Sequence, residues 1–153
     1  MAVSTTSIVS DIVTDVRDHL QTNLSDPRSS RTVTQWVLTG YPNVRVQYPV
    51  VIVQQVAGRD RWGGIGTENK IVTVTLNIEV WTDSTKERNT VWDDVYDELR
   101  THFTTADGGG NSITGYGMHH MRLISAVNVD TPYGESQIHR KIGTVEFTYY
   151  ASN

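Results

Sequence analysis

The chain has 153 residues, 37% of them hydrophobic, and its 17 acidic and 13 basic side chains give a formal net charge of -4. A chain of this size fits one domain, residues 1–153, around a single core, and the acidic balance excludes a strongly basic nucleic-acid binder. The absence of cysteine excludes disulfides and cysteine nucleophiles. No apolar run is long enough to predict a membrane span. The N-terminus lacks the basic start and the apolar stretch of a signal peptide, so none is expected.

The first predicted element is an amphipathic helix from Ser7 to Leu24. Its apolar side chains recur at intervals of three or four positions, which places them on one stripe of a helix. Ser7 is the expected N-cap, because its hydroxyl can accept a hydrogen bond from an amide of the first turn. The sequence Ser25-Asp26-Pro27 is expected to end the helix.

Two extended segments come next. The β-branched residues between Thr32 and Thr39 predict a short strand, and the alternation between Val44 and Val56 predicts a second. In the second strand, the parity that contains Val50 and Ile52 is expected to face the core. Pro49 cannot donate a ladder hydrogen bond, so this strand begins near Val50 or runs along a sheet edge.

A long glycine-rich connection is expected from Ala57 to Asn69, before the most regular strand of the sequence, Lys70 to Thr82. In that strand the even-numbered residues from Val72 to Val80 are apolar and face the core, whereas Trp81 lies on the other parity. Two extended segments on either side of one loop indicate an antiparallel hairpin.

The second amphipathic helix opens with a capping box of Ser84 and Glu87 and runs to about Phe103, and a second glycine-rich loop covers about residues 104–117. Two more strands are predicted at His119–Val129 and Ile138–Tyr150.

This order predicts an α+β fold with a mainly antiparallel sheet of four to five strands. Both helices are expected to pack on one face, because only one parity of each strand is consistently apolar.

The sequence predicts no catalytic, cofactor or metal site, and the chain is expected not to be an enzyme. His119 and His120 are neighbours on a strand and therefore point to opposite sides. The glycine run of Gly63 to Gly66 leads into a strand, whereas a phosphate-binding loop leads into a helix.

Three groups of residues are candidates for contacts with partners. Arginine and tryptophan in the first glycine-rich connection suit either a nucleic-acid contact or a protein interface: Arg59, Arg61 and Trp62. An acidic cluster on the second helix is either a solvated face or a surface that repels a polyanion: Asp93, Asp94, Asp97 and Glu98. Apolar residues on the parity opposite the helices are either scattered surface residues or a subunit interface: Val51, Val53, Trp81, Ile124, Ala126 and Tyr150.

The order and spacing of these elements, from Ser7 to Tyr150, resemble the tail terminator and tail-completion (head-tail joining) proteins of tailed viruses. The resemblance rests on the first helix, on the segment Tyr48-Pro49-Val50-Val51-Ile52-Val53, on a strand ending in Trp81-Thr82-Asp83, on the helix Val91 to Phe103 and on a closing pair of strands. The segment Thr32 to Val46 and the glycine-rich loop at Gly108 depart from the family pattern as insertions.

The resemblance implies a non-enzymatic virion protein at the head-proximal end of the tail, assembled in the host cytoplasm. Members form a homo-oligomeric ring, commonly a hexamer, that terminates the tail tube and joins it to the neck or connector of the capsid. The resemblance implies that Arg59, Arg61 and Trp62 reach the adjacent ring. It also implies that the acidic helix lines a lumen through which DNA passes without specific binding.

Two alternatives remain open at this point. A head-completion or neck adaptor protein of a tailed virus differs mainly in ring size and neighbours. A small α+β ligand-binding domain or enzyme is the alternative from another class, since fold does not determine function.

Overall fold

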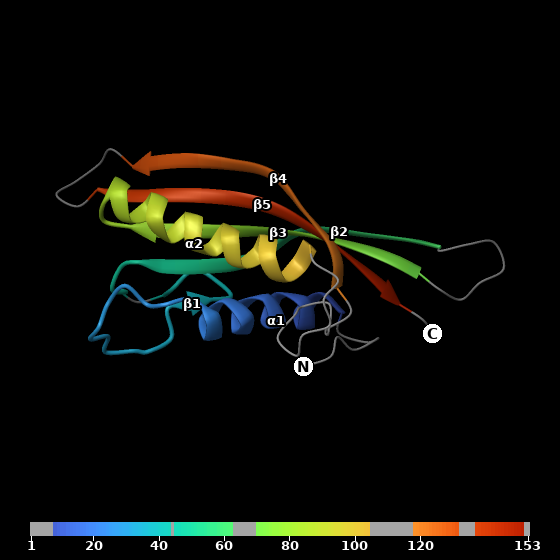
Figure 1. Cartoon of the computed structure of the whole chain (residues 1–153), viewed down its shortest axis with the longest axis horizontal. Helices are drawn as coiled ribbons and strands as arrows, with labels where there is room; N and C mark the ends of the chain where they lie inside the picture. The colour runs from blue at the N-terminus through green and yellow to red at the C-terminus, as the bar shows by residue number, and fades with distance from the viewer. Residues whose placement is uncertain (1–7, 44, 63–69, 105–117, 132–136, 152–153) are drawn as a thin grey trace.

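The computed structural model describes residues 8–43, 45–62, 70–104, 118–131 and 137–151. Over these residues the chain is α+β, with two helices and a five-stranded sheet (Figure 1). The elements in chain order are α1 (Ile8–Asn23), β1 (Val37–Leu38), β2 (Val50–Trp62), β3 (Lys70–Thr82), α2 (Thr85–Thr104), β4 (Met118–Thr131) and β5 (Ile138–Ala151).

The sheet is mixed, with the strand order β1-β2-β3-β5-β4. The four long strands pair antiparallel, whereas β1 pairs parallel with β2 through Val37 opposite Val51 and Leu38 opposite Ile52. The predicted strand between Thr32 and Thr39 is therefore reduced to two residues. The expectation of a mainly antiparallel sheet holds for the long strands and omits this parallel edge.

One continuous hydrophobic cluster joins the helices to the sheet. α1 contributes Ile12, Val16 and Leu20, and α2 contributes Val91, Trp92, Val95 and Leu99. We call the strand residues of this cluster the core face of the sheet: Val51, Val53, Val74, Leu76, Ile78, Val80, Val145 and Phe147. The alternate residues of the same strands form the outer face.

Local sequence signals account for several element ends. The amide of Glu87 donates to Ser84 Oγ over 3.2 Å, which confirms Ser84 as the cap of α2. The strand predicted at Lys70–Thr82 is β3 without a change of bounds, because its alternation is unbroken. The predicted N-cap Ser7 lies outside the described residues.

The connection predicted from Ala57 to Asn69 is partly wrong, because residues 57–62 continue β2 and pair with β3 as far as Trp62 opposite Lys70. A bulge between Gln55 and Ala57 shifts the register, so the core-facing parity changes from odd to even along β2. Residues 63–69 lie outside the described residues, as does the loop predicted over about 104–117 except for Thr104, which ends α2.

The predicted parity of β2 near its start is also wrong. Val51 and Val53 belong to the core cluster and are fully buried, so they lie on the core face and expose no side chain to a neighbouring subunit. Val50 and Ile52 lie on the outer face and are buried as well. The sequence is apolar on both parities here, because the segment before β2 folds over this end of the outer face and covers it, where Tyr41 contacts Glu79 and Trp81.

Candidate functional site: the outer face and the edges of the sheet

Arg59 and Arg61 lie on strand β2, and both stand on the outer face. They alternate along the strand opposite Thr73 and Ile71 of β3. Together with Glu146 and Thr148 of β5, these four residues line a pocket of about 430 Å³. Both arginines are exposed, and their position on a paired strand corrects the prediction that they belong to a loop.

A third arginine extends this surface across the sheet. Arg122 of β4 lies opposite Glu146 in the ladder, with its guanidinium 3.7 Å from Glu146 Oε1. We call the set of Arg59, Arg61, Arg122 and Glu146 the arginine groove. It carries three positive charges against one negative charge, in a protein whose net charge is -4. Trp62 ends β2, and its side chain is not among those described.

A polar cluster covers the other end of the outer face. The Tyr41 hydroxyl donates to Glu79 Oε1 over 2.7 Å, and the Trp81 indole N–H donates to Glu79 Oε2 over 2.8 Å. Glu79 is only 2% exposed, so both carboxylate oxygens are satisfied inside the protein. The hydrogen bond to Glu79 raises the pKa of the Tyr41 phenol, with burial adding to the shift.

This cluster gives Trp81 a role within the subunit. Its ring lies 5.5 Å from the Tyr41 ring, and the Arg140 guanidinium lies 5.5 Å from its centroid. Trp81 is half-buried by these neighbours. Sequence reasoning placed Trp81 correctly on the parity opposite the core but missed Tyr41 and Glu79, which are 38 residues apart.

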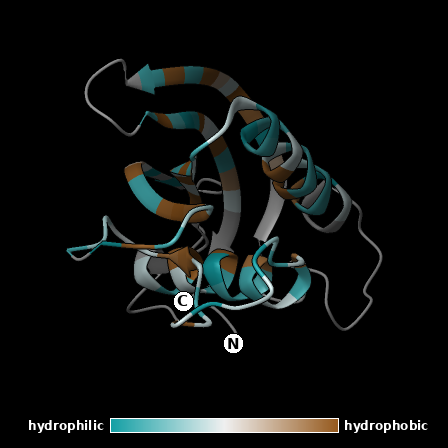
Figure 2. Ribbon diagram, turned by 90° about the vertical axis from the view of Figure 1, so that its left-hand side faces the viewer, coloured by the Kyte–Doolittle hydropathy of each residue, from teal (hydrophilic) through white to brown (hydrophobic). Residues whose placement is uncertain are grey.

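Apart from Tyr41, which is 52% exposed beside Trp81, the exposed large apolar side chains of the described residues lie toward the two opposite edges of the sheet. Val56 on β2 is 52% exposed, and Val33, in the segment before β1, is 66% exposed. On β4, at the other edge, Ile124 is 48% and Val127 is 54% exposed. Figure 2 shows hydrophobic bands along β4 at the upper rim of the sheet. Of the predicted interface residues, Ile124 and Ala126 are exposed, and the side chain of Tyr150 is not among those described. The predicted parity of Ala126 is wrong, because it lies opposite Gly143, which faces Trp92 of α2.

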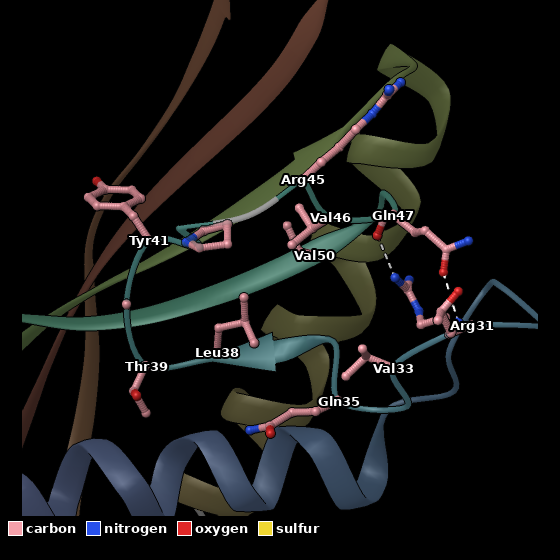
Figure 3. A pocket seen from close by; sticks show the side chains of 13 residues that line it. Arg31, Val33, Gln35, Leu38, Thr39, Tyr41, Arg45, Val46, Gln47 and Val50 are labelled. Carbon is pink, nitrogen blue, oxygen red and sulfur yellow. Dashed lines mark hydrogen bonds between the residues drawn. The ribbon is translucent and has the colours of Figure 1, made fainter.

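A larger pocket, of about 710 Å³, lies beside β1 (Figure 3). Its apolar lining includes Val33, Leu38, Val46 and Val50. Arg31 also lines it, but its guanidinium donates to Asp26 and to the backbone oxygens of Gln47 and Pro49. The Arg31 guanidinium therefore binds the segment around Gln47 and Pro49, which forms part of the pocket wall.

The acidic cluster predicted on α2 is divided by the structure. Asp93 and Asp94 are exposed, and exposed Asp97 pairs with Arg100 at 2.8 Å. Glu98 instead turns toward α1, where its Oε1 lies 2.7 Å from His19 Nε2, and its side chain is 18% exposed. Glu98 therefore joins the two helices and does not contribute to an exposed acidic face.

Within the described part of the chain, no three histidine or acidic side chains are grouped so as to hold a metal ion. Neither helix of that part is long and apolar enough to cross a membrane. Comparison with models of protein families gives no match for this chain, and comparison with curated proteins gives no significant match.

Proposed function

We propose that this chain is a non-enzymatic structural subunit that assembles into a ring of the tail-terminator type, most readily a hexamer, in the virion of a tailed virus. The observation that carries the proposal is the placement of exposed apolar side chains toward two different edges of one sheet. Two unlike patches on opposite sides of a subunit suit a head-to-tail contact, and a head-to-tail contact that closes on itself gives a ring.

We also infer that α1 and α2 cover the same face of the sheet. Two observations support this: one hydrophobic cluster contains side chains of both helices, and His19 of α1 bonds Glu98 of α2. With both helices on the core face, the end of the outer face that carries Arg59 and Arg61, close to the end of β2, is left for contacts between protein rings.

The arginine groove is the surface proposed to dock on the next ring, which is the tail tube or the neck. Arginine is favoured at protein interfaces because its planar guanidinium binds carboxylates with two hydrogen bonds. The groove therefore suits acidic side chains of a partner. The exposed Asp93, Asp94 and Asp97 of α2 are proposed to face a lumen that DNA passes without specific binding.

The 710 Å³ pocket supports one alternative from another class, a small ligand-binding domain. A thermal-shift screen with apolar small molecules separates the two proposals. Stabilisation of the wild-type chain that is lost in Val46→Arg favours the ligand-binding domain.

The test of the ring proposal is negative-stain imaging of the purified chain with polymerising tail-tube protein. We expect rings, and tubes capped at one end. A twelvefold ring that binds capsid connectors favours the neck adaptor, and a monomer that leaves tube growth unchanged contradicts both viral proposals.

A further inference from the structure

The two edges of the sheet differ in how they are covered. β4 is 14 residues long and pairs only with β5 among the described strands. β2 is 13 residues long, but β1 pairs with it only through Val51 and Ile52. Over residues 53–62, the outward side of β2 therefore has no strand neighbour within the described part of the chain (Figure 1).

Such long edges expose rows of backbone N–H and C=O groups, which are ready to pair with another strand. Both edges carry a bulge at mid-length, between Gln55 and Ala57 in β2 and between Leu123 and Ser125 in β4, and β4 has a second one between His119 and Arg122. Bulges guard an edge against unselective pairing. Here, however, the residue at each mid-length bulge is an exposed apolar one, Val56 and Ile124, with Val127 close to the latter.

Strand direction decides which pairing continues the sheet. The four long strands alternate in direction across the order β2-β3-β5-β4, so β2 and β4 of one subunit run in opposite directions. A rotation about an axis roughly along the strands preserves strand direction. It therefore brings β4 of one copy beside β2 of the next in antiparallel orientation, the more stable ladder.

We propose that β4 of one copy adds to residues 53–62 of β2 in the next copy, so that one antiparallel sheet continues around the ring. This inference rests on the proposed ring and names its subunit contact. The occupant of each edge is a second copy of the same chain, because the two edges have complementary directions, the 14-residue β4 is long enough to cover residues 53–62 of β2, and each edge carries an exposed apolar residue.

Cross-linking tests this contact directly, because the chain contains no cysteine and every engineered thiol is unique. The variants are Val56→Cys and Ile124→Cys, one labelled with ¹⁵N, treated with a short bismaleimide that tolerates a shift in register. Thr22→Cys on the exposed side of α1 is the matched control. Circular dichroism checks that each variant is folded.

We expect cross-linked dimers from a mixture of the Val56→Cys and Ile124→Cys chains, and little product from either chain alone or from a mixture with the control. Dominant cross-links within one variant indicate a two-fold contact and overturn the inference. If the wild type forms rings without the mixed cross-link, the edge contact is wrong and the ring proposal stands. If the wild type stays monomeric with tail-tube protein, the ring proposal itself fails.

A second variant removes the contact without a cross-linker. Val127→Lys places a charge on the exposed side of the β4 edge, a device that keeps edges from pairing. We expect loss of the ring in light scattering with an unchanged melting temperature of the subunit. Retention of the full ring in Val127→Lys contradicts the inference.

Discussion

The two faces of the sheet differ in burial and in charge. On the core face, Trp92 of α2 packs directly on Gly143 of β5, and the cluster around them consists of buried apolar side chains. On the outer face, one end holds the buried Glu79 with its two hydrogen-bond donors, and the other end is the exposed arginine groove. Stability therefore resides mainly on the core face and at Glu79, whereas the groove is available for a partner.

The greatest loss of stability is expected from a change at Gly143. A β-carbon at this position would lie 1.9 Å from a ring carbon of Trp92, which no small adjustment relieves. Gly143→Ala is expected to destabilise the subunit by about 3 kcal/mol, the upper end of the usual range for overpacking. Urea unfolding measures the effect. Gly40→Ala is the matched control, since nothing lies within 4 Å of its added β-carbon, and equal losses in both variants contradict this packing.

A somewhat smaller loss is expected at Glu79. Glu79→Ala leaves the Tyr41 hydroxyl and the Trp81 N–H without their acceptor, at a cost of about 2 kcal/mol. Glu79→Gln keeps one acceptor oxygen and should lose less. The absorbance of the tyrosinate reports on the same contact, because removal of Glu79 should lower the pKa of Tyr41 toward its ordinary value of 10.0. An unchanged Tyr41 titration in both variants refutes the role of this carboxylate.

A modest, pH-dependent effect is expected at Asp130 of β4. The hydrogen bond to His139 and the nearby Arg88 guanidinium lower the pKa of Asp130 below its ordinary value of 3.8. A lowered pKa means that this carboxylate contributes stability above pH 3.8 and loses it as the pH falls through the folded-state pKa. Plots of melting temperature against pH, from about pH 2 to about pH 5, should therefore be flatter for Asp130→Asn than for the wild type. Parallel plots exclude this contribution.

Changes in the arginine groove should affect stability least. Arg59→Ala with Arg61→Ala changes exposed side chains, so the free energy of unfolding should stay within about 0.5 kcal/mol of the wild type. Docking to the neighbouring ring should weaken, as measured by pull-down of tail-tube or neck protein. Arg45→Ala, another exposed arginine, is the control. Unchanged docking in the double variant removes the groove from the proposed interface.

The sequence predicts those elements whose signals are local. The unbroken alternation of β3 and the Ser84 cap of α2 lie within a few residues, and both are confirmed. The extension of β2 to Trp62 was missed because glycine and arginine are typical of loops, whereas pairing with β3 determines the structure there. The bulge between Gln55 and Ala57 also changes which residues of β2 face the core, from odd-numbered before the bulge to even-numbered after it.

The candidate site was harder to predict because it depends on distant contacts. Val51 and Val53 look no different from Val50 and Ile52 until the segment carrying Tyr41 is seen to cover the outer face. Glu98 belongs to an acidic run in sequence, but His19, 79 residues away, draws it to α1. The parity pattern did indicate Ile124 as an apolar residue outside the core, and it is 48% exposed at the bulge between Leu123 and Ser125.

Native mass spectrometry of the wild-type chain decides whether the subunit forms a closed ring, since the mass of a ring is a whole multiple of the 17.1 kDa subunit mass. We expect a closed species near six times the subunit mass, which falls to the subunit mass in Val127→Lys. A wild-type chain that remains at 17.1 kDa, alone and with tail-tube protein, contradicts ring assembly.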